Sequence, residues 1–155
     1  VNAFVKATQD TFGMMLRSTV SLKDMQASKT FSPAGDISAL IGITGSNGEG
    51  MVSISFPLDL GREFISRLLS REVSTLTDEQ LNDGVGEVVN MISGGAKSIL
   101  SQEMNSAYKL SIPSVVRGDG HTIAGCMQGT PYLVLTFQTE DNQEFYIHVA
   151  FKLND

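Results

Sequence analysis

The chain has 155 residues, 41% hydrophobic and 18% charged, a balance typical of a soluble globular protein that forms one domain, residues 1–155. Its net charge of −6, with 11 Lys and Arg residues and no dense basic cluster, argues against nucleic-acid binding. No apolar run approaches the roughly 18 residues of a membrane helix, and the first residues are too polar for a signal peptide, so we expect no membrane insertion.

The first elements are a helix and a strand. Apolar residues recur every three or four positions over residues 2–17, which predicts a helix with a core-facing stripe that includes Met15. A strand should follow over residues 19–25. Pro33 and Gly35 then interrupt the chain.

Residues 36–57 predict a β-hairpin, because apolar residues alternate on both sides of a glycine-rich link. Asn47 and Gly48 favour a tight turn, since both tolerate positive φ. The alternative is a phosphate-binding loop, which needs a Lys and a Ser or Thr after its last glycine. Here Gly50 is followed by Met51, so the hairpin is the better interpretation.

Two helices come next. Residues 58–70 have the spacing of an amphipathic helix, with Leu69 on its apolar face. Thr77 and Gln80 stand three residues apart, as in a capping box, and predict the start of a long helix over residues 78–103.

The last third is rich in strands. Four are expected, over residues 108–118, 121–128, 131–138 and 144–153. Pro113 should place the first at an edge or a bulge. The last two form a hairpin. The succession of helices and hairpins predicts an α+β fold: a largely antiparallel or mixed sheet with long helices packed against it, in two similar halves.

Three residues with reactive side chains fall in these strands. Cys126 excludes an intrachain disulfide and fits a reducing compartment such as the cytoplasm. We interpret it as a small buried hydrophobe, because the local sequence offers only His121 as a basic neighbour. His121 and His148 are interpreted as structural residues rather than metal ligands.

The long helix has an unusual polar face. At 100° per residue its apolar residues fall within about 80°, whereas Asp83, Glu87, Asn90 and Gly94 fall within about 60° on nearly the opposite side. The apolar residues are Leu81, Val85, Val88, Ile92, Ala96 and Ile99.

An ordinary solvated face would be built from Lys, Glu and Gln, but this one is surrounded by glycines that each cost roughly 1 kcal/mol in a helix. The four glycines are Gly84, Gly86, Gly94 and Gly95. They suggest that another molecule approaches the helix closely.

Several chemistries can be compared at this face. Two carboxylates without a third ligand or a histidine would bind a metal weakly, so we expect no metal site. Glycoside hydrolysis needs a deep pocket and a shifted pKa. An amide, however, can hold a water while donating a hydrogen bond, and a carboxylate beside it can pair with a cation. Asn90 and Glu87 are therefore suited to hydrolysing a phosphoryl group held by another molecule.

Asp83-x3-Glu87-x2-Asn90 resembles the signature of the CheC/CheX/FliY phosphatases of bacterial chemotaxis: Asp or Ser, three residues, Glu, two residues, Asn. The segments DISALIGITGSNGEGMVSISF and LSIPSVVRG resemble the family's hairpin before the motif helix and its strand after it. The resemblance spans nearly the whole chain. Because the first helix has no Glu-x2-Asn, the chain is most similar to the single-motif CheX type.

The resemblance implies a function and a set of roles. The substrate would be a phosphorylated response regulator of the CheY type, which carries the aspartyl phosphate, the Mg²⁺ and an active-site Lys. Glu87 would bind that Lys and Asn90 would orient the attacking water. Asp83 would support the site and Gly94 would leave room for the regulator. The protein would need no cofactor of its own, act in the cytoplasm and form a homodimer through sheet edges, with the C-terminal strand as one candidate edge.

A second interpretation stays open. A CheX-like domain could bind a regulator or a signalling scaffold as an adaptor without turnover. An adaptor has no chemical need for both Glu87 and Asn90, so the intact pair favours the phosphatase.

Overall fold

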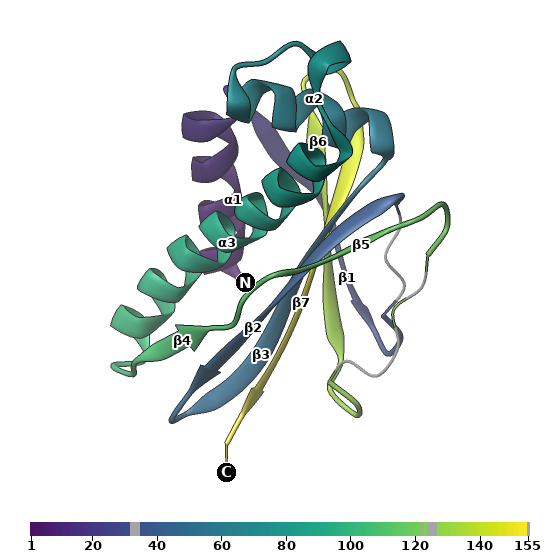
Figure 1. Ribbon diagram of the computed structural model, residues 1–155. Coiled ribbons are helices and arrows are strands. Elements are labelled where there is room, and N and C mark those ends of the chain that lie inside the picture. Colours follow the sequence, from purple (N-terminus) through teal and green to yellow (C-terminus); the bar gives the residue numbers. More distant parts are fainter. Residues whose placement is uncertain (32–34, 122, 124–126, 155) are drawn as a thin grey trace.

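The computed structural model describes residues 1–31, 35–121, 123 and 127–154, in three α-helices, a short 3₁₀ helix and seven strands (Figure 1). In chain order they are α1 (Asn2–Met15), β1 (Val20–Ser28), β2 (Ile37–Gly45), β3 (Gly48–Phe56), α2 (Leu58–Leu69), η1 (Val73–Thr75), α3 (Asp78–Glu103), β4 (Tyr108–Leu110), β5 (Ser114–Arg117), β6 (Tyr132–Thr139) and β7 (Glu144–Leu153). The break between β4 and β5 contains Pro113, as predicted.

The strands form one sheet in the order β1-β6-β7-β3-β2-β4, and every described pairing is antiparallel. β5 pairs with the same edge of β2 as β4 does, at the other end of that strand. The α-helices cover one face of this sheet (Figure 1). The α+β prediction is confirmed.

The two halves of the chain are arranged alike. β3 and β7 pair at the centre, β2 and β6 flank them, and β1 and the β4–β5 segment lie outermost. With β5 as the outer partner of β2, the order is β1-β6-β7-β3-β2-β5. If β1, β2 and β3 are exchanged with β5, β6 and β7, the same order results, read from the other edge of the sheet. A helix precedes each set of strands, α1 in one half and α3 in the other. The expected similarity of the halves is therefore present in the topology.

The main core lies between the helices and the sheet. Alternate residues of each central strand face the helices, for example Ile41, Ile54 and Ile147, which are at most 1% exposed. Phe12 of α1 stacks on Phe145 of β7, with ring centroids 4.7 Å apart and planes inclined by 13°. Further phenylalanines, Phe56, Phe64 and Phe137, extend this aromatic cluster across α2, β3 and β6.

The long helix begins and ends as predicted, at Asp78 and Glu103. Its capping box is complete: the Gln80 backbone N–H donates to Thr77 Oγ1 at 3.1 Å, and the Thr77 backbone N–H donates to Gln80 Oε1 at 3.0 Å. These bonds satisfy two N–H groups at the start of the helix. The result is a 26-residue helix with a fixed start.

The hairpin over residues 36–57 is confirmed, but its turn differs from the prediction. Gly45 pairs with Gly48, so Ser46 and Asn47 form the two-residue turn. Neither Asn47 nor Gly48 has a positive φ. Gly48 is needed for space instead, because a Cβ there would lie 2.6 Å from the Lys152 carbonyl oxygen of β7.

Two other expectations are wrong. The C-terminal strand is not an edge: β7 pairs with β6 on one side and β3 on the other. The segment 121–128 is not a strand where it is described, at His121, Ile123 and residues 127–128. Cys126 and Pro33 lie outside the described residues.

Candidate functional site

The three motif residues and Gly94 lie on the outward face of α3, as the spacing predicted. Asp83 and Glu87 are exposed, while Asn90 and Gly94 are half-buried. Within the described part of the chain, the side chains of Asp83, Glu87 and Asn90 take part in no hydrogen bond or ion pair with the protein. Their polar atoms are therefore available to a binding partner.

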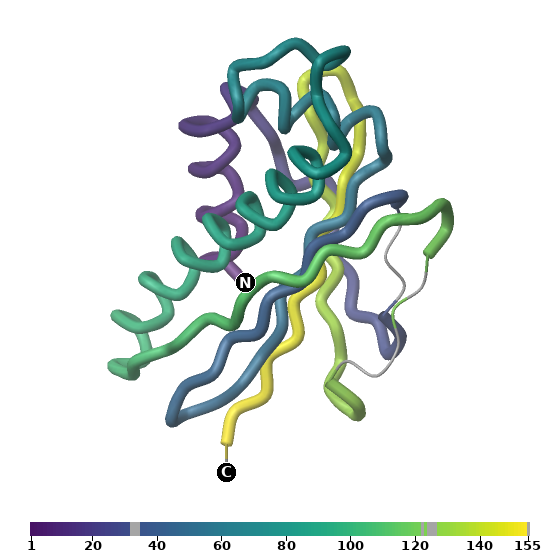
Figure 2. Tube along the Cα trace, in the orientation of Figure 1, coloured from purple at the N-terminus to yellow at the C-terminus, as the bar shows by residue number. Residues whose placement is uncertain are grey.

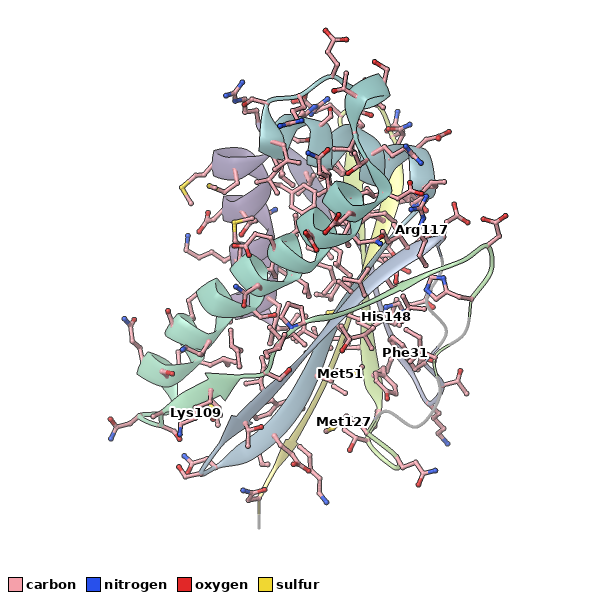
Figure 3. All side chains as sticks on the ribbon, in the orientation of Figure 1. Phe31, Met51, Lys109, Arg117, Met127 and His148 are labelled. Carbon is pink, nitrogen blue, oxygen red and sulfur yellow. The ribbon has the colours of Figure 1, made fainter. Side chains whose placement is uncertain are left out.

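The start of α3 is held from both sides. Arg62 of α2 and Arg117 at the end of β5 both contact Asp78 Oδ1, at 3.4 Å and 3.0 Å. Figure 3 shows Arg117 beside the start of α3. Each exposed ion pair contributes little to stability, but together the two connect α2 and the end of β5 to the first turn of α3.

Two of the glycines near the motif serve packing inside the molecule, which corrects the view that all four leave room for a partner. A Cβ on Gly84 would lie 2.5 Å from Ile65 Cγ2 of α2, and one on Gly95 would lie 3.1 Å from Ala7 Cβ of α1. Both glycines let another helix of the same chain approach α3. Gly94 differs, because a Cβ there would meet nothing within 4 Å.

A groove runs along the Glu87 side of the motif, with a volume of about 690 Å³. It lies between α3 and the C-terminal ends of α1 and α2, and its lining residues are Met15, Leu68, Leu69, Arg71, Gln80, Asp83, Gly84, Glu87 and Met91. Met15 and Leu69 were expected to face the core. Each stands at the last residue of its helix, and they are 46% and 39% exposed because they face this groove; in α1 the core contact passes to Leu16, which is fully buried.

After α3 the chain reverses and runs back beside the helix (Figure 2). Residues 108–117 lead toward the start of α3, where Arg117 meets Asp78. The helical period places Gly86, which this segment contacts, on the same side of the motif as Asn90. A Cβ on Gly86 would lie 3.4 Å from Val115 Cγ2 and 3.8 Å from Pro113 Cβ. These are ordinary van der Waals distances, so the returning segment packs beside Gly86 and leaves a partner no direct access to that position.

The sequence alone did not point to this segment or to the groove as parts of the site. Pro113 and the segment LSIPSVVRG were interpreted only as a strand break and as a strand after the motif helix, and a helical wheel shows nothing of what lies beside the helix.

The opposite face of the sheet holds both histidines. His121 Nε2 lies 2.8 Å from Ser38 Oγ, and its Nδ1 lies 2.8 Å from the Gly118 carbonyl oxygen. His148 is 2% exposed and packs edge-on against Phe31, with ring centroids 4.9 Å apart (Figure 3). Among the described residues, no three His, Cys, Asp or Glu side chains are grouped so that they could hold a metal ion. None of the described helices is long and apolar enough to span a membrane.

The seven-stranded antiparallel sheet under a motif-bearing long helix is the fold of the chemotaxis CheX and CheC-like proteins. The chain belongs to the CheX family: the family model described as "Chemotaxis phosphatase CheX" matches residues 37–138. The predicted resemblance is confirmed. A search of curated proteins found no match.

Three solved structures illustrate the similarity. The CheX protein of Desulfovibrio desulfuricans is 32% identical, with a TM-score of 0.83 over 99% of this chain and 97% of its own. CheX from Vibrio vulnificus is 29% identical, with a TM-score of 0.85 over 98% of each chain. A CheX–CheY–BeF3–Mg²⁺ complex from Borrelia burgdorferi contains a chain 20% identical to this one, with a TM-score of 0.75 over 97% of this chain and 96% of that one, a likeness of fold alone.

Proposed function

We propose that the protein dephosphorylates the aspartyl phosphate of a CheY-type response regulator, with Glu87 and Asn90 as the catalytic pair. The observation that supports this most directly is the ridge on α3, where a carboxylate and an amide face outward without partners among the described residues. Membership of a family described as chemotaxis phosphatases supports the reaction. The Borrelia complex supports the partner, because there a CheX protein is bound to CheY.

The chemistry follows from what the two side chains can do. Asn90 accepts a hydrogen bond from a water through its carbonyl oxygen and holds that water in line with the phosphorus. Glu87 pairs with the Lys of the regulator and so fixes the two proteins in register. Asp83, one turn earlier on the same face, supports the contact with the partner.

The reaction balances without a covalent intermediate on this chain. The water oxygen forms a bond to phosphorus as the bond between phosphorus and the aspartyl oxygen breaks. The regulator regains its carboxylate, and the water's protons leave with the inorganic phosphate. The Mg²⁺ belongs to the regulator and neutralises charge on the transferring group. The contribution of this chain is therefore positioning.

Substituting Asn90 tests the proposal. Asn90→Ala should lower the stimulated rate of dephosphorylation by at least about a hundredfold, while the thermal unfolding temperature stays close to that of the wild type. Ser101→Ala is a matched control, because Ser101 lies eleven residues later on the same side of α3, roughly 16 Å along the helix. A normal rate in the Asn90 variant would refute the assignment.

Glu87→Gln should act on recognition more than on chemistry, because it removes the charge that faces the regulator's Lys and leaves the shape unchanged. We expect a raised KM for the phosphorylated regulator and a weaker dependence of KM on salt. If the wild-type protein binds phosphorylated regulators but accelerates the decay of none, the adaptor is the correct interpretation.

We also propose a cytoplasmic location and a homodimer. Since β7 lies inside the sheet, a dimer formed through sheet edges would have to use β1 or the β4–β5 segment. Light scattering on the purified protein tests the oligomeric state.

A further inference from the structure

Beside the motif stands an isoleucine that is almost fully in water. Ile112 is 88% exposed, the highest value among the large hydrophobic residues described. It lies in the short connection between β4 and β5, in the segment that returns along α3. A lone exposed apolar residue is ordinary, and Ile112 is distinguished by what surrounds it.

The backbone on both sides of Ile112 is fixed. Ser111 is tied to β2 twice: its N–H donates to the Gly42 carbonyl oxygen at 2.9 Å, and its Oγ accepts from the Gly42 N–H at 2.8 Å. On the other side Pro113 packs near Gly86 of α3. A proline restricts the residue before it to extended conformations, and a β-branched side chain has few rotamers. Ile112 is thus held rigidly in an exposed position.

Measured along the axis of α3, Ile112 lies at about the position of Asn90. Pro113 stands beside Gly86, and the segment runs in the direction opposite to the helix. Asn90 is four residues beyond Gly86, or about 6 Å along the helix axis. The two residues before Pro113 span about 6.6 Å of extended chain, so Ser111 and Ile112 reach about the level of Asn90 along the helix axis.

A partner seated on the motif would therefore cover Ile112. A specific interface buries about 800 Å² on each partner, and a ridge of three polar side chains offers much less. The remaining area must come from the two sides of the ridge, the groove next to Glu87 and the segment next to Asn90. A rigid apolar side chain loses little conformational entropy on binding, which makes it an efficient anchor.

We propose that Ile112 is a preformed apolar anchor that inserts into the response regulator next to its phosphorylation site. The inference depends on the proposed function and extends it to the docking surface. Ile112 sets the affinity for the regulator, whereas Asn90 and Glu87 act at the phosphoryl group. Nothing in the described chain has to move for this contact to form.

The test compares Ile112→Ser with Met25→Ser, a substitution on β1 at a methionine that is 49% exposed and outside the groove and the returning segment. For a phosphorylated CheY-type receiver domain, Ile112→Ser should raise KM roughly tenfold to a hundredfold and leave kcat within about twofold of the wild type. Ile112→Val should restore most of the affinity. Met25→Ser should change neither constant, and thermal unfolding should show that each variant is folded.

An unchanged KM in Ile112→Ser would overturn the inference while leaving the proposed function intact. If that variant also loses a homodimer, Ile112 belongs to a contact between copies of this chain. If the wild-type protein itself accelerates no receiver's dephosphorylation, the proposed function fails instead, and the two failures are distinguishable.

Discussion

Gly94→Ala and Gly84→Ala make the same chemical change ten residues apart on one helix, yet only the first should stabilise the fold. Each substitution removes a glycine from a helix interior, which is worth about 1 kcal/mol of added stability where the new methyl group fits. At Gly94 the Cβ meets nothing within 4 Å, so the full gain is expected. For a chain of this length the Tm should rise by about 2–4 °C.

At Gly84 the same Cβ would lie 2.5 Å from Ile65 Cγ2. Ile65 is completely buried, so the new methyl group fits only if α2 and α3 separate or if Ile65 leaves its rotamer. Overpacking of this kind costs about 1–3 kcal/mol, which exceeds or cancels the gain in helix propensity. We expect the Tm of Gly84→Ala to be unchanged at best and several degrees lower at worst.

Thermal and urea unfolding of the two variants measure the difference directly. Activity then separates folding from function: Gly94→Ala should be more stable but bind the phosphorylated regulator more weakly, if Gly94 gives the partner room. A destabilised Gly94→Ala variant would refute the reasoning from open space. A stabilised variant with an unchanged KM would refute the role of Gly94 in docking.

Three further predictions concern the frame of the molecule. Thr77→Ala should lower the free energy of unfolding by about 1 kcal/mol, since it removes one bond of the capping box; an unchanged urea midpoint would show that the cap contributes nothing. The hydrogen bond from Lys23 lowers the pKa of the Glu144 carboxyl below its ordinary 4.5, so this pair stabilises the fold above that pH, and the contribution is lost as the pH falls through the folded pKa. Glu144→Gln should therefore flatten the acid side of the stability curve relative to Glu140→Gln, and identical curves would contradict the assignment. Phe12→Ala should cost about 3–5 kcal/mol in chemical denaturation, because its ring is completely buried in the aromatic cluster, and a loss below about 1 kcal/mol would mean that the cluster repacks.

Local signals in the sequence predicted what depends on neighbours along the chain. The capping residues Thr77 and Gln80 gave the start of α3, and the helical period placed Glu87 and Asn90 on its outward face. Pro113 marked the break between β4 and β5. In each case one side chain or a fixed spacing determines the backbone nearby, whatever packs against it.

The wrong predictions depend on contacts between distant segments. Gly84 and Gly95 were interpreted as space for a partner, because a helical wheel cannot show that α2 and α1 lie against those two positions. Segment 121–128 alternates like a strand, but His121 is held by side-chain and backbone bonds to Ser38 and Gly118 instead of a ladder. The place of β7 inside the sheet follows from strand order, which no local pattern encodes.

The mirrored order of the sheet has a consequence for how such a protein can diverge. Each half provides a helix ahead of its strands, so the architecture contains two comparable positions for a motif-bearing helix. In this chain α3 has the Glu-Asn pair, and α1 has an unrelated sequence that meets α3 through Ala7 and Gly95. A descendant could gain a second polar motif on α1 by a few surface substitutions, without altering the order of a single strand.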